Sequence, residues 1–244
     1  MLGEAHVSLG WIKERWEWDF AAAEREYIRA IELNPDYATA HHRYGVFLGT
    51  MGRFDESIAA LERARQLDPL SLIIATDLSL PYFWSRRHER AIEVLRKALE
   101  IDPNFARAHA HLAQNYRVLG RYEEAIAEQQ KAFELSGGQF REDGTKRVNG
   151  TLAVIYAAAG RKSEAQKILD EMTEAEKHGD YLYSFGRAVI YAELGDKERA
   201  FAWLEKAFAE RFSGMTELKV APTFDSLRDD PRFQDLLRRV GFPP

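Results

Sequence analysis

Proline recurs at a fixed interval in this chain, and that interval limits the folds the chain can adopt. Pro35, Pro69 and Pro103 lie 34 residues apart, and each ends a similar apolar and acidic phrase. A fourth step of 34 residues reaches Gly137. Both residue types end helices, proline because it lacks an amide hydrogen and glycine because it accepts a left-handed backbone. A regular period of this length indicates a chain built from repeated structural units.

A second marker lies midway through each unit and indicates a tight turn between two helices. It begins at Gly52, Arg86, Gly120, Gly160 and Gly195. Between markers, apolar residues recur at helical spacing, as they do over residues 125–133. Each unit is therefore expected to consist of a helix, a tight turn, a second helix and a proline or glycine stop.

The repeat resembles the tetratricopeptide repeat (TPR). The family pattern is present in the second unit at Tyr44, Gly45, Leu48, Ser57, Leu61, Ala64 and Pro69, and in the fourth at Leu112, Ala113, Tyr116, Gly120, Tyr122, Ala125 and Ala132. The resemblance implies an all-α, right-handed superhelix of about six helix-turn-helix repeats. We place them at about 4–37, 38–71, 72–105, 106–139, 146–179 and 181–214, with residues 140–145 as a loop. The first unit departs from the pattern, because residues 16–20 replace the glycine turn.

Small residues and the C-terminal tail complete this prediction. Alanine recurs at positions 23, 91, 125, 165 and 200, where two helices would cross closely and a larger side chain would force them apart. Residues 215–244 break the repeat and are expected to form a capping segment over the last repeat. Asp230 is a suitable N-cap for its helix, and Pro231 suits the first helical position. The whole pattern is similar to the C-terminal TPR region of bacterial multidomain signalling and regulatory proteins.

Composition excludes several classes of function. The formal net charge is −5, which argues against a nucleic-acid partner. The chain has no cysteine, so disulfides and thiolate chemistry are excluded. Its first residues lack the basic and apolar regions of a signal peptide, and the uncharged apolar stretch 78–85 is too short to cross a bilayer. A soluble cytoplasmic protein without membrane contact is the expectation.

No pattern of catalytic or metal-binding residues stands out. The histidine pairs 41–42 and 109/111 lie 68 residues apart, or two full repeats, and so are too distant to share one metal ion. The carboxylates of residues 55–56 and 123–124 are expected in the first turn of a helix, where they stabilise the helix dipole. No glycine-rich phosphate loop follows a strand. We therefore expect neither an enzyme nor a bound cofactor or metal.

In TPR proteins the first helix of each pair lines a concave groove, and the resemblance assigns a partner-binding surface here. It pairs an apolar stretch with a basic rim and suits a protein or peptide with apolar and acidic groups. Pro81 lies inside one of its helices and should kink that helix near Asp77. The expected groove residues are Thr39, His42, Arg43, Val46, Thr50, Ile73, Thr76, Asp77, Leu80, Phe83, Trp84, Arg107, His111, Gln114, Arg117, Arg147, Thr151 and Val154.

Three alternatives stay open at this point. Phe83 and Trp84 could instead pack against the N-terminal helix or a neighbouring domain. The chain could form a homodimer through an aromatic N-terminal edge made by Trp11, Trp16 and Trp18. It could also be a regulatory segment that senses a small molecule, although an open groove suits this less than an enclosed pocket does.

Overall fold

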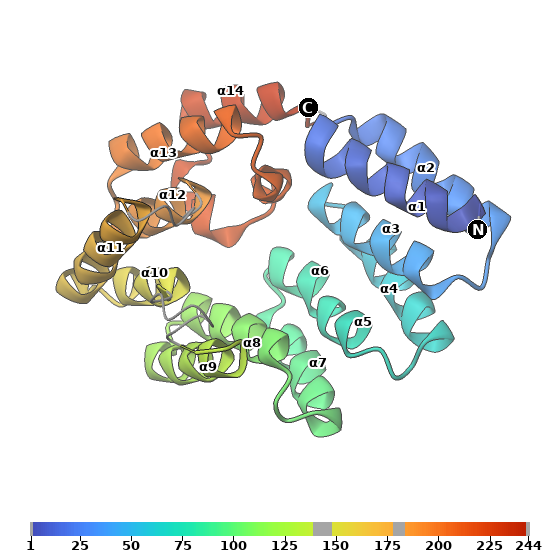
Figure 1. The fold of residues 1–244 in the computed structure, drawn as a ribbon, viewed down its shortest axis with the longest axis horizontal. Coiled ribbons are helices and arrows are strands. Elements are labelled where there is room, and N and C mark those ends of the chain that lie inside the picture. Colours follow the sequence, from blue (N-terminus) through green and yellow to red (C-terminus); the bar gives the residue numbers. More distant parts are fainter. Residues whose placement is uncertain (1, 139–147, 178–183, 243–244) are drawn as a thin grey trace. The chain divides into compact units, whose positions relative to one another are not determined.

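The computed structural model describes residues 2–138, 148–177 and 184–242, and Figure 1 shows the arrangement of its helices. All regular elements in these residues are helical, which confirms the all-α fold class. In chain order they are α1 (Leu2–Ile12), η1 (Lys13–Glu17), α2 (Phe20–Leu33), α3 (Ala38–Thr50), α4 (Phe54–Leu67), α5 (Leu72–Asp77), α6 (Ser79–Trp84), α7 (His88–Ile101), α8 (Ala106–Val118), α9 (Tyr122–Leu135), α10 (Gly150–Ala158), α11 (Lys162–Lys177), α12 (Ser184–Glu193), α13 (Lys197–Ala209), η2 (Ser213–Glu217), η3 (Pro222–Leu227) and α14 (Pro231–Val240). The loop expected at 140–145 lies outside the described residues.

Consecutive helices pack in pairs joined by the predicted tight turns. The turn glycines Gly52, Gly120, Gly160 and Gly195 all have a left-handed backbone, with φ between 72° and 84°. The recurring alanines at positions 23, 91, 125, 165 and 200 are all fully buried, as expected for close helix crossings. The division into a repeat domain, 1–214, and a C-terminal segment, 215–244, remains a prediction.

The first helix of the third unit is interrupted as Pro81 predicts. It ends at Asp77 and resumes at Ser79, so that α5 and α6 are separate short helices. Pro81 has no amide hydrogen, so it cannot donate a helical hydrogen bond to the carbonyl group of Asp77, four residues earlier. Pro81 itself is buried in the second of the two short helices.

The chain divides into two compact units. Unit 1 comprises Met1–Val94, Arg211–Pro222 and Asp229–Pro244, and unit 2 comprises Leu95–Glu210 and Thr223–Arg228. The boundary between the first segments of the two units falls inside α7, so the units do not follow the repeat boundaries.

The C-terminal helix has the predicted ends. Asp230 caps α14 by accepting a hydrogen bond from the Arg232 amide, and Pro231 begins the helix. The helix belongs to unit 1, where Phe242 stacks on Phe20 of α2 with ring centres 4.9 Å apart. This contact joins residues that are distant in the sequence, which local patterns do not encode. The expectation that the helix covers the last repeat remains a prediction.

Candidate protein-docking surface

In unit 1 the predicted groove residues divide into a buried and an accessible set. His42, Val46, Thr76 and Asp77 are buried, as is Thr50 at the end of α3. Thr39 and Leu80 are half-buried. Arg43 on α3 and Ile73 on α5 are exposed, and the side chain of Ile73 keeps 51% of its surface accessible. The accessible set thus combines a cation with an aliphatic side chain.

A buried polar pair joins two of the first helices in unit 1. His42 Nε2 of α3 lies 2.9 Å from Asp77 Oδ2 of α5, and both side chains are almost fully buried. A buried carboxylate is costly unless it is hydrogen-bonded, and this contact supplies a partner. We therefore assign His42 and Asp77 a structural role, fixing α3 against α5.

Phe83 and Trp84 of α6 also lie inside unit 1. Phe83 meets the His88 ring edge-on, with ring centres 5.5 Å apart. The indole of Trp84 fills the space beside Gly49 of α3, because a Cβ atom there would lie only 2.6 Å from the ring. Both rings are more than nine-tenths buried, so the structure gives them packing partners within the unit.

In unit 2 the predicted residues are again only partly accessible. Arg107 on α8 and Thr151 on α10 are exposed, His111 and Gln114 are half-buried, and Val154 is buried. Arg147 lies outside the described residues.

Arg117 of α8 is buried and makes polar contacts with two other side chains. It pairs with Glu193 of α12, and its Nη2 donates a hydrogen bond to the Thr223 hydroxyl at 2.9 Å. Burial raises the pKa of the Glu193 carboxyl, and the neighbouring Arg117 opposes that rise. Arg117 therefore joins first helices within unit 2.

The histidines have a repeating structural role. His41 and His109 occupy equivalent positions two repeats apart, and each places Nε2 near the carbonyl oxygen of an equivalent proline, Pro35 at 2.8 Å and Pro103 at 2.9 Å. His109 Nδ1 also contacts Glu128. Among the described residues, no group of three or more histidine, aspartate or glutamate side chains could hold a metal ion.

A buried ionic cluster that the sequence did not reveal lies at the end of α1. Glu14 is 2% exposed, accepts a hydrogen bond of 2.8 Å from the Tyr27 hydroxyl and lies 3.2 Å from Arg15 Nε. Burial raises the pKa of the Glu14 carboxyl, whereas Arg15 opposes that rise. Burial and Glu14 together raise the pKa of the Tyr27 hydroxyl. This cluster lies on η1, a π-helical turn of a kind often found at functional sites.

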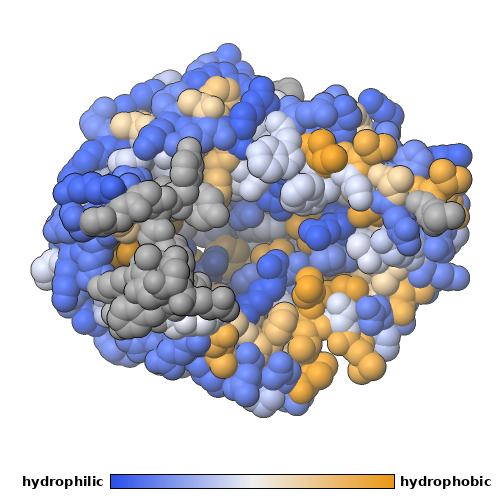
Figure 2. Space-filling model, in the orientation of Figure 1, coloured by the Kyte–Doolittle hydropathy of each residue, from blue (hydrophilic) through white to orange (hydrophobic). Residues whose placement is uncertain are grey.

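The N-terminal edge is apolar on its outer side. Leu2, Leu9, Ile12 and Trp16 are 40% to 71% exposed and recur at heptad-like spacing, opposite the face that packs on α2. Figure 2 shows exposed apolar surface over these N-terminal helices at the right of the view. Trp11 is also exposed, whereas Trp18, which we had grouped with these two tryptophans, is buried.

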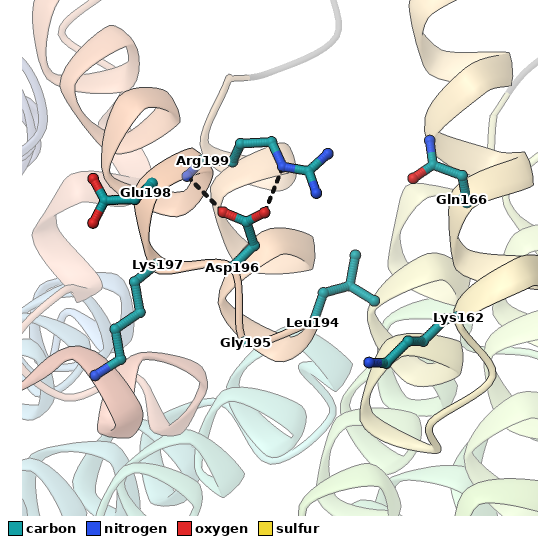
Figure 3. A pocket seen from close by; sticks show the side chains of 8 residues that line it. All are labelled: Lys162, Gln166, Leu194, Gly195, Asp196, Lys197, Glu198 and Arg199. Atoms are coloured by element: carbon teal, nitrogen blue, oxygen red, sulfur yellow. Dashed lines mark hydrogen bonds and ion pairs between the residues drawn. The ribbon is translucent and has the colours of Figure 1, made fainter.

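A polar pocket of about 520 Å³ lies in unit 2 between α11 and the α12–α13 turn. Figure 3 shows that its side chains come from both elements. Arg199 is held by Asp196, which also caps α13 by accepting from the Arg199 amide. This pair stabilises the start of α13, and nothing in the pocket converges on a bound group.

Comparison with known proteins identifies the repeat. One model of the tetratricopeptide repeat matches residues 19–71, 48–105 and 151–212, and a second model of the same repeat matches residues 104–178. The chain belongs to the tetratricopeptide repeat family. No curated protein matches the chain.

Solved TPR structures share the fold at low sequence identity. PilF of Pseudomonas aeruginosa is 14% identical, with 97% of each chain covered and a TM-score of 0.57. A thermophilic TPR protein of Thermus thermophilus is 19% identical over 97% of this chain and 99% of its own, with a TM-score of 0.52. A mutant O-GlcNAc transferase of Thermobaculum terrenum is 27% identical over 55% of this chain, with a TM-score of 0.49, and the match spans 26% of the transferase chain.

TPR units typically form interaction modules without catalytic residues of their own, so the family places this chain among protein-interaction scaffolds. No helix in the described part of this TPR chain has both the length and the apolar character needed to span a membrane.

Proposed function

We propose that this TPR chain is a docking module that binds a protein or peptide segment carrying apolar and acidic groups. Exposed residues on the first helices support this proposal. In unit 1, Arg43 and Ile73 offer a guanidinium and an aliphatic side chain, and in unit 2 Arg107 offers a second guanidinium. Guanidinium groups form strong paired hydrogen bonds with carboxylates, and apolar surface favours an apolar anchor. Within each unit, the partner-binding surface is centred on that unit's own exposed residues, and the buried predicted residues of the same unit hold its helices in place.

Site-specific photo-cross-linking tests this proposal. A photoreactive phenylalanine analogue replaces Ile73 or Arg107 on first helices in one pair of variants. In matched controls it replaces Gln66 of α4 or Lys131 of α9, which are exposed on second helices. We expect the first-helix variants to trap a protein in cell extract, and addition of Arg43→Glu to reduce the yield at Ile73 at least fivefold. Equal trapping from both kinds of helix would contradict docking on the first helices.

A second candidate function, self-association, is favoured by the outer face of α1 and η1. Leu2, Leu9, Ile12 and Trp16 form an exposed apolar stripe, and soluble monomers rarely expose continuous apolar surface of this kind. A second copy of α1 would cover it, since the same stripe can pack against itself about a twofold axis. This candidate retains Trp16 from the predicted aromatic edge and omits the buried Trp18.

Analytical ultracentrifugation of the full chain separates the two candidates. Self-association predicts a dimer whose fraction rises with concentration and which Leu9→Glu dissociates. The matched variant Leu70→Glu changes a still more exposed leucine, 81% accessible, away from α1, and should leave the dimer intact. A monomer at all concentrations would exclude self-association and leave docking unaffected.

A further inference from the structure

Two turns in this chain lack the glycine that the repeat uses. Trp18 and Arg86 occupy the position of Gly52 in their own units, and both keep its left-handed backbone, with φ of 57° and 64°. Left-handed backbone is unfavourable for residues with a side chain. Such strained backbone persists mainly where the surrounding structure or the function requires that side chain. In unit 1, both side chains contact a segment that is distant in the sequence.

Both side chains contact the segment Arg211–Pro222. The Arg211 guanidinium lies 4.6 Å from the centre of the Trp18 ring and reaches the carbonyl oxygens of Trp16 and Glu17. Arg86 Nη1 donates a hydrogen bond of 2.9 Å to the Val220 carbonyl and also reaches the carbonyl of Trp84. Arg211 itself has a left-handed backbone, with φ of 53°. The described residues other than glycine that have positive φ are thus all at this contact.

A third arginine holds the middle of the same segment. Arg15 Nη1 donates to the Ser213 carbonyl at 3.3 Å and lies 3.8 Å from a carboxylate oxygen of Glu217. Arg15 of η1 and Arg86 of the α6–α7 turn therefore bind main-chain carbonyl groups of this segment, and Arg15 also pairs with the carboxylate of Glu217. Recognition of main-chain carbonyls is how folded domains hold extended peptides of varied sequence.

Apolar side chains anchor the segment between these polar contacts. Met215 and Leu218 are fully buried, and Val220 is 4% exposed. The segment has little regular structure apart from the single turn η2. It thus combines apolar anchors with one acidic group, the chemistry that the docking proposal assigns to a partner.

We propose that residues 211–222 occupy a peptide-docking surface of unit 1, and that a partner segment must displace them to bind there. This inference rests on the proposed docking function and defines the ligand more closely. The partner segment carries two or three apolar residues within six positions and an acidic residue for Arg15, and its backbone carbonyl replaces that of Val220 at Arg86.

Hydrogen–deuterium exchange and peptide binding, both on the full chain, test this inference. Arg86→Gly removes the anchor and relieves the strained backbone, so it releases the segment without opening a core cavity. The control is Arg87→Gln in the same turn, since Arg87 contacts Tyr82 and Asp55. The probe is a fluorescein-labelled synthetic peptide of residues 211–222. We expect Arg86→Gly to speed amide exchange over residues 215–220 about threefold, whereas Arg87→Gln leaves the exchange unchanged.

A second variant carries the peptide test and covers the case in which Arg86→Gly is poorly folded. Val220→Asp weakens the segment and leaves its docking surface unchanged, so that chain should bind the wild-type peptide at least tenfold more tightly than the wild-type chain does. A peptide carrying the same substitution should bind at least tenfold more weakly. Unchanged exchange in both variants, or faster exchange in Val220→Asp without tighter peptide binding, would overturn the inference. Cross-linking at Ile73 and Arg107 tests the docking function separately, so either proposal can fail alone.

Discussion

The turns with glycine and the turns without it differ in what lies around them. At Gly52, Gly120, Gly160 and Gly195 no heavy atom of the described residues, beyond the immediate chain neighbours, lies within 4 Å of a Cβ placed on the turn. At Trp18 and Arg86 the side chain reaches the Arg211–Pro222 segment. The same left-handed turn is therefore built in two ways. Glycine serves where the turn only reverses the chain, and a strained side chain serves where the turn also binds another segment.

The largest expected effect comes from removing the aromatic turn residue. Trp18→Gly relieves the strained backbone but deletes an indole that is 6% exposed and stacked under Arg211. Loss of a buried tryptophan outweighs the relief, and we expect the free energy of unfolding to fall by about 3 kcal/mol. Urea denaturation measures this change. Trp16→Ala is the control, since Trp16 is 53% exposed and should cost roughly 0.5 kcal/mol or less. Similar losses in the two variants would mean that Trp18 contributes no buried contact.

The glycine turns should respond to backbone strain alone. Gly120→Ala places a methyl group in open space at a φ of 73°, so the expected loss of about 1 kcal/mol comes from the left-handed conformation itself. Gly186→Ala in α12 provides the contrast. The added Cβ again meets open space, but the backbone there is that of a right-handed helix. Alanine is favoured over glycine there by about 1 kcal/mol. Thermal unfolding should shift down for the first variant and up for the second, and shifts of the same sign would refute the argument.

Much of the fold follows from local patterns in the sequence. The 34-residue period predicts the helix pairs because the recurring proline or glycine of each unit follows the end of a helix, and Pro81 and Asp230 act on their own neighbours in the chain. The family geometry was less informative for side chains. It placed Phe83 and Trp84 on the groove, but Gly49 leaves room for the indole within unit 1.

Contacts between residues distant in the sequence could not be predicted in this way. Arg15 and Ser213 are separated by 198 residues, and Arg86 and Val220 by 134, and each pair meets through a main-chain carbonyl that has no sequence signature. Tryptophan and arginine at glycine positions of the repeat, Trp18 and Arg86, were the visible signals. They indicate that a turn has a second role, although they do not identify the partner.

A substitution with a smaller expected effect separates the cost of backbone strain from the contribution of the side-chain contact at Arg86. Asparagine tolerates the left-handed conformation better than other residues with a side chain, so Arg86→Asn keeps the turn and removes the guanidinium. We expect the free energy of unfolding to fall by roughly 0.7 kcal/mol, as for the loss of hydrogen bonds that water can partly replace. Arg87→Gln again serves as the control in urea denaturation. A gain in stability would show that the bond to Val220 contributes nothing.

The smallest expected effect concerns Glu14 of η1. Its carboxylate pairs with Arg15, whose guanidinium donates a hydrogen bond to the Ser213 carbonyl. Burial raises the pKa of the Glu14 carboxyl above the ordinary value of 4.5, so the folded chain retains this proton to higher pH than the unfolded chain. Stability therefore falls as pH rises from the ordinary value through the raised pKa. Glutamine does not titrate, and Glu14→Gln should match wild type near pH 4 and exceed it at pH 8. The gain should be on the order of 0.5 kcal/mol, because attraction to Arg15 offsets most of the cost of burying the charge. Urea denaturation across this range measures the difference in the free energy of unfolding between Glu14→Gln and wild type. A difference that shrinks with rising pH would show that the ion pair with Arg15, and not burial, determines the protonation of Glu14.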